Sequence, residues 1–250
     1  MSQRKKVKKM LTHLSLFSGI GGLDLAAEWA GIKTVEQCEW ADYPFKVLCK
    51  HWPDVPKWRD IHELTGDSFH ERTGLRTVDI ISGGFPCQPF SVAGKRRGAE
   101  DDRYLWSEMC RVIAELRPTW VVGENVAGIV NMALDTVLSD LEAQGYAART
   151  FIIPACGVGA PHRRYRAAIV ACHADSSGCG RQQRRQNAQQ PADGSWWAAE
   201  PRVGRVADGI PNRMDRIRCL GNAVVPQQFY PIFKAIAAMK GGEEDGRHSR

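Results

Sequence analysis

The sequence predicts one main α/β domain built on a doubly wound, mostly parallel sheet. Short apolar runs alternate with segments of helical period from Leu11 onward. The chain has 250 residues, of which 43% are hydrophobic, so it can bury one substantial core. From about Cys172 the composition changes to Gly, Ser, Gln and Arg, which does not continue a sheet core. We therefore expect a small, irregular insertion before the chain returns to the domain.

The expected elements follow one another in simple alternation. Strands are short runs of apolar or β-branched residues, whereas helices carry an apolar stripe with helical spacing and end near glycines such as Gly145. The expected strands are 13–17, 34–38, 78–82, 120–122, 150–153 and 167–171, and the expected helices are 23–30, 42–51, 104–116, 132–141 and 228–239.

Charge and cysteine usage narrow the class of protein. The net charge of +6 is concentrated in residues 149–220, which hold twelve arginines and no lysine against five acids. Arginine pairs bidentately with phosphates and base edges, which favours nucleic-acid binding, although a merely solvated basic face is the alternative. The eight cysteines include no C-x-x-C pair, so neither a metal site nor a disulfide framework is favoured. With no membrane-length apolar run and no signal peptide, we expect a cytoplasmic protein.

The first candidate site is a glycine turn. Residues 18–22 (Ser-Gly-Ile-Gly-Gly) lie between a strand and a helix, where α/β folds bind adenosine-containing ligands. Asp24 occupies the place of the third glycine of the dinucleotide fingerprint, which disfavours a pyrophosphate and hence a nicotinamide dehydrogenase. Glu39 ends the second strand, where it can accept hydrogen bonds from a ribose, and Trp40 offers a face for adenine. A tight turn without a ligand is the alternative.

Candidate catalytic side chains follow two later strands. Cys87 stands between two prolines on a glycine-started loop, which suggests a nucleophile. Glu124 follows the 120–122 run on the same sheet edge as Cys87 and Gly19, which indicates an acid or hydrogen-bonding role. An inert thiol and an exposed rim charge are the alternatives.

Arginines precede the last expected strand. Arg164 and Arg166 alternate in an extended segment, so both side chains project to one side. Surface solvation is the alternative to a role in the site.

Taken together, these motifs resemble the DNA cytosine-5 methyltransferase family over most of residues 13–240. The segments that carry the resemblance are 17–22, Glu39-Trp40, Asp60-Ile61, 83–91, 124–126, Arg164 with Arg166, and 220–224, in the family's order. The chain departs from the family at His162, where a glutamine is usual, and in a segment before Gly221 that is shorter than usual.

The resemblance implies a Rossmann-like class I methyltransferase fold that uses S-adenosylmethionine and no metal. It implies methyl transfer to C5 of a cytosine flipped out of duplex DNA, through a bond from Cys87 to C6 of the base, with Glu124, Arg164 and Arg166 as further catalytic residues. The cofactor site that it implies consists of Phe17, Gly19, Ile20, Gly21, Gly22, Leu23, Glu39, Trp40, Asp60, Ile61, Gly83, Pro86, Leu105, Asn222, Ala223 and Val224.

The resemblance also implies that the chain consists of three segments. Residues 1–171 would form the catalytic domain, 172–211 a short target-recognition segment, and 212–250 a return to the catalytic domain with a C-terminal helix and a disordered tail. The expected DNA-contacting residues are Gln88, Ser91, Arg202, Arg205, Arg213, Arg216 and Arg218. A tRNA cytosine-5 methyltransferase and a non-catalytic DNA-binding regulator on the same fold are the alternatives, and we expect a monomer.

Overall fold

A seven-stranded sheet organises the protein. The computed structural model describes residues 10–86, 105–175 and 212–242. The strands are β1 (Thr12–Leu16), β2 (Lys33–Cys38), β3 (Lys57–Trp58), β4 (Ile80–Gly83), β5 (Trp120–Val126), β6 (Tyr146–Ile153) and β7 (Arg166–His173), in the order β3-β2-β1-β4-β5-β7-β6. Strand β7 runs antiparallel to β5 and β6 on either side of it, and every other pair is parallel. The strand order reverses between β1 and β4, so the crevice for a ligand is expected at the carboxyl ends of these strands.

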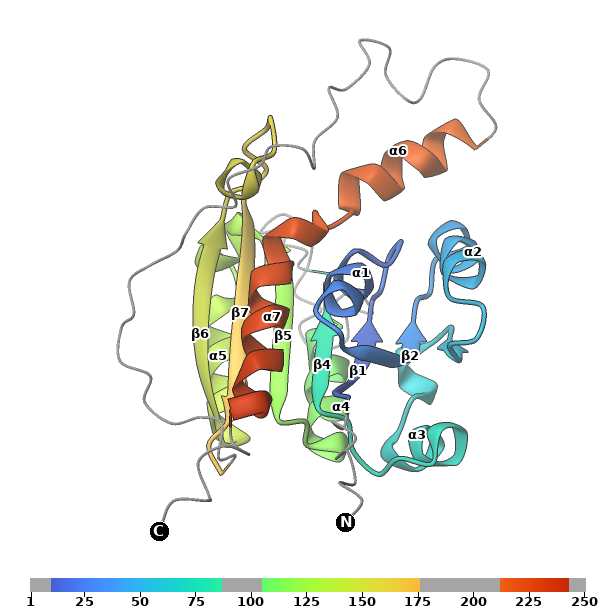
Figure 1. Ribbon diagram of the computed structural model, residues 1–250, viewed down its shortest axis with the longest axis vertical. Coiled ribbons are helices and arrows are strands. Elements are labelled where there is room, and N and C mark those ends of the chain that lie inside the picture. Colours follow the sequence, from blue (N-terminus) through green and yellow to red (C-terminus); the bar gives the residue numbers. More distant parts are fainter. Residues whose placement is uncertain (1–9, 87–104, 176–211, 243–250) are drawn as a thin grey trace, which may run out of the picture.

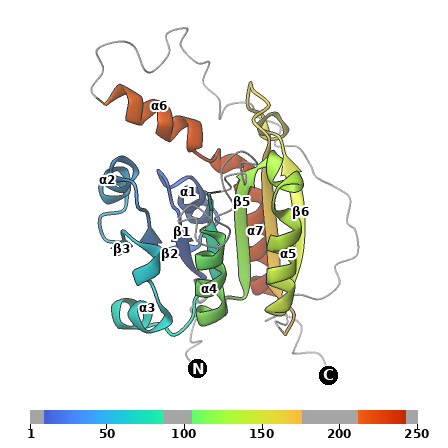
Figure 2. The ribbon, with the colours of Figure 1, turned by 180° about the vertical axis from the view of Figure 1, so that it is seen from behind.

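Helices cover both faces of the sheet. They are α1 (Gly22–Trp29), α2 (Asp42–His51), α3 (Gly66–Thr73), α4 (Trp106–Leu116), α5 (Leu134–Ala143), α6 (Arg213–Asn222) and α7 (Pro226–Gly242), with 3-10 turns η1 (Ile61–Glu63), η2 (Ala127–Asn131) and η3 (Ala155–Val158). Figure 1 shows α1 and α7 in front of the sheet, and Figure 2 shows α4 and α5 on the opposite face. The doubly wound, mostly parallel fold is therefore confirmed.

The two helical layers bury separate apolar clusters. On one face, α7 buries Phe229, Phe233 and Ile236, which lie one helical turn apart, against side chains of β4 and β5 such as Ile80 and Val122. On the other face, α4 buries an apolar stripe that consists of Trp106, Met109, Val112, Ile113 and Leu116. The central strands β1, β4 and β5 bury nearly every residue, because strands covered on both faces have no solvent side, whereas the edge strand β6 exposes half of its residues.

The sequence prediction located most elements and missed three. Strand β3 has only two residues, and α3 has a single buried residue, Phe69, although the capping box of Thr65 and Ser68 marks its start. Helix α6 buries only Cys219. None of the three carries an apolar stripe long enough to be recognised. Strand β5 extends past its expected end to Val126 because β7 pairs with it in the antiparallel sense.

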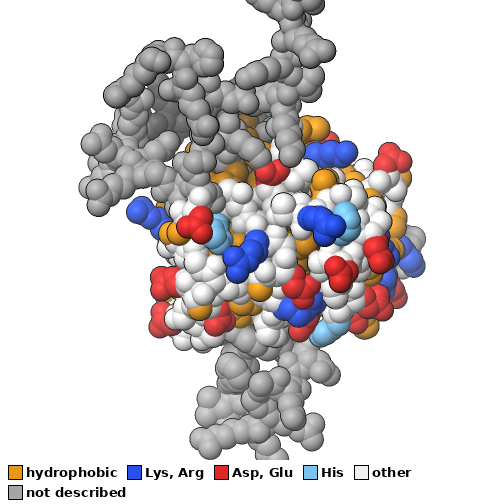
Figure 3. All heavy atoms as spheres, turned by 90° about the horizontal axis from the view of Figure 1, so that it is seen from below, with side chains coloured by type: hydrophobic (Ala, Val, Ile, Leu, Met, Phe, Trp, Pro, Cys, Tyr) orange, Lys and Arg blue, Asp and Glu red, His pale blue; other side chains and the backbone are white. Residues whose placement is uncertain are grey.

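The surface of the described residues carries both signs of charge. Figure 3 shows the face at the amino ends of the parallel strands, where acidic and basic side chains are interspersed. This face does not have the basic concentration expected of a nucleic-acid surface. Among the described helices, none is long and apolar enough to cross a bilayer.

Candidate functional site

The glycine turn joins β1 to α1 through unusual backbone angles. Phe17 has a φ of 51° and Gly21, the last residue before α1, a φ of 86°. The amide of Gly21 donates to the carbonyl of Ser18 at 2.9 Å. A Cβ atom on Gly21 would lie 2.3 Å from the ring of Trp52, so only glycine fits here. The turn is therefore held by its own backbone and by close packing.

Asp24, the residue that departs from the dinucleotide fingerprint, has a structural role. It is fully buried in α1 and accepts hydrogen bonds from Ser15 Oγ (2.9 Å) on β1 and from Gln37 Nε2 (2.8 Å) on β2. Burial raises the pKa of Asp24 to about 6, although both hydrogen bonds oppose the shift. The carboxyl group thus fixes α1 against the first two strands.

Glu39 links the glycine turn to the start of α2. Its carboxylate accepts hydrogen bonds from the amide of Gly19 (2.7 Å) and the amide of Ala41 (2.8 Å). Burial raises the pKa of Glu39, and the two backbone amides oppose that rise. Each carboxylate oxygen has a second lone pair, so Glu39 retains acceptor capacity for a ribose. Trp40 beside it is 70% exposed, which leaves an aromatic face free for stacking.

One cavity of about 790 Å³ gathers most of the predicted cofactor residues. It lies at the carboxyl ends of the parallel strands, at the reversal of strand order. The predicted residues that line it are Phe17, Gly19, Ile20, Gly22, Leu23, Glu39, Trp40, Pro86, Leu105, Glu124, Arg218, Asn222, Ala223 and Val224. Ser18 and Gly84, which lie in the predicted segments 17–22 and 83–91, line it as well. Sequence reasoning missed further lining residues, which are Ala41, Asp42, Tyr43, Pro44, Lys46, Asn212, Asp215 and Cys219. Most of these follow β2 or lie on α6, the helix that had no recognisable apolar stripe.

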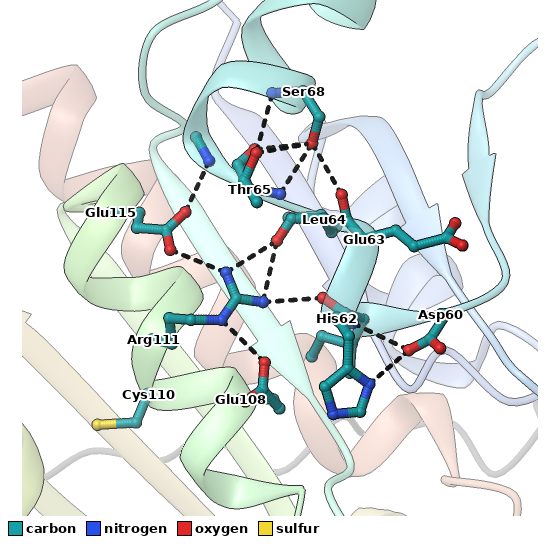
Figure 4. Close-up of polar contacts among 12 residues, drawn as sticks. Asp60, His62, Glu63, Leu64, Thr65, Ser68, Glu108, Cys110, Arg111 and Glu115 are labelled. Carbon is teal, nitrogen blue, oxygen red and sulfur yellow. Dashed lines mark hydrogen bonds and ion pairs between the residues drawn. The ribbon is translucent and has the colours of Figure 1, made fainter.

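Four predicted cofactor residues lie outside this lining: Gly21, Asp60, Ile61 and Gly83. Figure 4 shows that the Asp60 carboxylate accepts hydrogen bonds from the backbone amide (2.9 Å) and the ring (2.6 Å) of His62. The hydrogen bond from the His62 amide is the main reason that the pKa of Asp60 is lowered. Arg111 on α4 donates to the carbonyls of Ile61 and Leu64, so this turn is anchored to the body of the protein. A contact between Asp60 and a cofactor stays a prediction.

Glu124 and Arg166 form a buried ion pair beside the cavity. Arg166 Nε lies 2.8 Å from Glu124 Oε1, and the two side chains are only 11% and 10% exposed. Burial raises the pKa of Glu124, and the charges of Arg166 and Arg164 oppose the rise. Gly84, just after β4, passes so close that a Cβ atom would lie 2.8 Å from Glu124 Oε2. The acid is thus confined between β7 and the loop that leads to Cys87.

Arg164 contacts a different part of the molecule from Arg166. Its Nη2 donates to the carbonyl of Gly221 (2.7 Å) in the last turn of α6 and to the carbonyl of Ala223 (2.5 Å) just after that helix. Ala223 lines the cavity, so Arg164 supports the cavity wall while Arg166 pairs with the acid. A catalytic role for Arg164 and for Arg166 stays a prediction.

The loop that leads to Cys87 is anchored before it leaves the described residues. Asn125 Nδ2 donates to the carbonyl of Phe85 at 2.9 Å, and the Phe85 ring packs on Trp106 with 4.9 Å between centroids. Pro86 then lines the cavity. Sequence reasoning did not assign a role to Asn125, although it follows Glu124 directly. Five predicted residues lie outside the described part of the chain: Cys87, Gln88, Ser91, Arg202 and Arg205.

The described arginines of α6 fall into two groups. All three are exposed, but only Arg218 lines the cavity, together with Asp215 and Cys219. Their spacing along α6 places Asp215, Arg218 and Cys219 on one face of the helix. The same helix therefore closes the cavity and presents two further arginines to the outside.

The family model for the C-5 cytosine-specific DNA methylase matches residues 11–209. The chain belongs to this family. It is 36% identical over 181 residues to the type II methyltransferase M.Eco47II of Escherichia coli, covering 69% of this chain and 42% of that protein. It is 31% identical over 170 residues to the type II methyltransferase M.HhaI of Haemophilus parahaemolyticus, covering 66% of this chain and 50% of that protein.

Solved structures of other methyltransferases have the same fold as this chain. A prophage-encoded methyltransferase from E. coli superposes with a TM-score of 0.57 at 26% identity, over 65% of this chain and 47% of that one. S. pombe Dnmt2 superposes with a TM-score of 0.58 at 23% identity, over 69% of this chain and 53% of that one. The chain thus spans about half of each solved chain, and 42% and 50% of the two type II enzymes.

Proposed function

We propose that this protein transfers a methyl group from S-adenosylmethionine to C5 of a cytosine in DNA. The observation that carries the proposal is that one cavity joins the glycine turn and Glu39 to Glu124 and to Pro86, the residue before Cys87. A cofactor site and a catalytic acid that share a cavity can bring two reactants together, which is the largest requirement of a group transfer. Among the described residues, no cluster of three or more His, Cys, Asp or Glu could hold a metal ion.

The cavity residues fit S-adenosylmethionine. Glu39 retains acceptor capacity for the ribose, and the exposed face of Trp40 suits an adenine ring. The amino end of α1 directs its backbone amides and its positive dipole end towards the glycine turn, which suits a carboxylate. S-adenosylmethionine, when bound, supplies an electrophilic methyl group on its sulfonium.

The chain's own residues would activate the cytosine. Cytosine C5 is a weak nucleophile, and addition of the Cys87 thiolate to C6 breaks the aromaticity and places electron density on C5. Glu124, which pairs with Arg166 and lines the cavity, can bond to N3 and the exocyclic amine of the base and stabilise the developing charge. After C5 has accepted the methyl group, loss of the C5 proton and elimination of the thiolate regenerate both the ring and the cysteine.

DNA is the proposed substrate because the twelve arginines of residues 149–220 give that segment a basic excess. The target carbon is enclosed in a duplex, so the base must be flipped out of the stack to reach the cavity. Arg213 and Arg216, exposed on α6 next to the cavity, are suitably placed for phosphate contacts.

A duplex that contains 5-fluorocytosine tests this function. Fluorine at C5 cannot leave as a proton does, so the wild-type protein should form a denaturation-resistant complex with such DNA in the presence of S-adenosylmethionine. Cys87→Ser should form none. Recovery of free wild-type protein, or equal trapping by Cys87→Ser, would contradict the mechanism. If the protein methylates tRNA and not duplex DNA, the mechanism stands and the proposal that DNA is the substrate is wrong.

A further inference from the structure

Gln228 is a buried polar residue on the apolar side of α7. It is 1% exposed and precedes Phe229, which is completely buried against the sheet. An amide in such a place is costly unless it is hydrogen-bonded, and an apolar residue would pack there without that cost. We therefore infer the role of Gln228 from the groups to which its side chain is hydrogen-bonded.

All the hydrogen bonds of the Gln228 side chain that the structure describes go to two main-chain carbonyls. Nε2 donates to the carbonyl of Ile153 at 2.6 Å, at the end of β6, and to the carbonyl of Arg164 at 3.0 Å, just before β7. Oε1 is buried and has no hydrogen-bond partner among the described residues. Turning the amide over would place Oε1 against two carbonyl oxygens, so its orientation is determined by these two acceptors.

These bonds tie Arg164 to the C-terminal segment at two points. The main-chain carbonyl of Arg164 accepts from Gln228, and its guanidinium donates to the carbonyls of Gly221 and Ala223. Residues 223–228 are continuous in the chain. The bonds of Arg164 to Ala223 and to Gln228 therefore close a ring that contains Arg164 and the start of α7. Residue 164 cannot move without moving residues 221–223.

The same ring reaches the catalytic acid. Arg166 lies two residues after Arg164, pairs with Ile153 of β6 and Val126 of β5 in the sheet, and makes the ion pair with Glu124. Gln228 donates to the carbonyl of Ile153, the β6 residue that pairs with Arg166, and to the carbonyl of Arg164, two residues before Arg166. A shift of either acceptor would change the angle at which Arg166 meets Glu124.

We propose that Gln228 is a positioning residue that couples the cofactor cavity to the Arg166–Glu124 pair. It acts through Arg164 and holds residues 221–223 at the cavity wall while it keeps Arg166 aligned. This inference rests on the proposed function, because it concerns how the methyl-transfer site is held together. Its geometry can nevertheless be tested without methyl transfer.

Three single variants separate hydrogen bonding from packing. Gln228→Met retains the approximate size and removes the donor, and Gln228→Glu replaces the donor by an acceptor that faces two carbonyl oxygens. The neighbouring Gln227, half-buried and outside the site, provides the control Gln227→Met. We expect kcat/KM for methyl transfer to fall about 10- to 100-fold in Gln228→Met, because small misplacements of a reacting site are costly, and further in Gln228→Glu. Gln227→Met should resemble the wild type.

Two further measurements distinguish positioning from a general structural role. Amide hydrogen exchange of residues 221–225 should accelerate at least several-fold in Gln228→Met, while exchange in β1 and α4 stays unchanged. Affinity for S-adenosylmethionine, measured by calorimetry, should fall by the same factor in Gln228→Met, in Arg164→Ala and in the double variant, because both residues act in one ring.

Wild-type exchange at 221–225 in Gln228→Met, or losses that multiply in the double variant, would overturn the coupling. Equal activity of Gln228→Met and Gln227→Met would overturn it as well. An inactive wild-type protein would instead overturn the proposed function, and the exchange measurement would still decide the role of Gln228.

Discussion

Two walls of the same cavity are held in place by different kinds of interaction. The turn wall, residues 17–23 with Glu39 and Trp40, is held by backbone geometry and by buried groups beneath it, such as Asp24. The C-terminal wall, residues 212–224, is mostly exposed, and Arg164 supports it with two hydrogen bonds. The walls meet where Gly22 approaches the carbonyl of Val224.

One half of the site is thus formed by elements that are consecutive in the chain, and the other half by contacts between segments far apart in sequence. The turn wall follows from β1, a glycine turn and α1, which are consecutive in the chain. The C-terminal wall depends on Arg164, which lies two residues before β7, and on Gln228, which lies in α7. Variants that change the backbone or the packing of the glycine turn should therefore affect the fold most, whereas variants that remove a side chain lining either wall should affect ligand binding.

The largest effect is expected from Gly21→Ala in the turn wall. Alanine would adopt a left-handed backbone conformation and meet the ring of Trp52, since the Cβ position lies 2.3 Å from it. We expect the free energy of unfolding to fall by about 3 kcal/mol or more, measured by urea denaturation.

Gly31→Ala is the matched control, because Gly31 also has a positive φ, 75°, but no atom lies within 4 Å of its Cβ position. It should cost only about 1 kcal/mol. Equal losses in the two variants would show that the packing of Trp52 on the turn contributes nothing.

The second effect concerns the pH dependence of the buried acids near the turn wall. Burial raises the pKa of Glu36 on β2 to about 7, opposed by the charge of Arg72. Since the folded pKa lies above the ordinary value of 4.5, the stability from this group is complete below about pH 4.5 and is lost as pH rises through about 7. Glu36→Gln should remove about 2–3 kcal/mol of this loss between pH 5 and pH 8.

Urea denaturation at several pH values measures it, with the exposed Glu63→Gln as the control. Asp24 should leave a smaller loss of the same sign that is complete above about pH 6, because burial also raises its pKa. A pH profile of Glu36→Gln that coincides with the wild type would rule out Glu36 as the titrating group.

The third effect compares ligand binding by the two walls. Glu39→Ala should weaken S-adenosylmethionine binding by about 1.5–3 kcal/mol, because a carboxylate makes a charge-assisted hydrogen bond to the ribose. Asn222→Ala in the C-terminal wall removes a neutral group and should cost about 0.5–1.5 kcal/mol. Calorimetry measures both, and unchanged affinity in Glu39→Ala would remove this carboxylate from the site.

The smallest effect is expected on the outer side of the C-terminal wall. Arg213→Ala and Arg216→Ala should each reduce the salt dependence of DNA binding by about one unit of slope if each side chain contacts one phosphate. Arg218→Ala should instead weaken cofactor binding, because Arg218 lines the cavity. Titrations at two salt concentrations with cognate and scrambled duplexes measure these differences. A salt slope that none of the three variants changes would assign DNA contact to other segments.

Local patterns in the sequence were sufficient for the fold class and for one wall of the site. The apolar stripe of α4 and the buried run of β4 report burial directly, because side-chain period follows from backbone geometry. The glycine turn and Glu39 were found for the same reason, since each lies at a fixed place after a strand. The resemblance to the methyltransferase family rests on these local motifs.

Other features were decided only by the tertiary structure. The antiparallel direction of β7, the helix α6 and the place of Asn125 beside Phe85 have no periodic signature, because they depend on partners far away in the chain. Gln228 lies in a helix that the sequence predicts, yet its function depends on the carbonyls of Ile153 and Arg164. A sequence pattern records whether a side chain is buried, but the identity of a hydrogen-bond partner emerges only when distant segments are brought together.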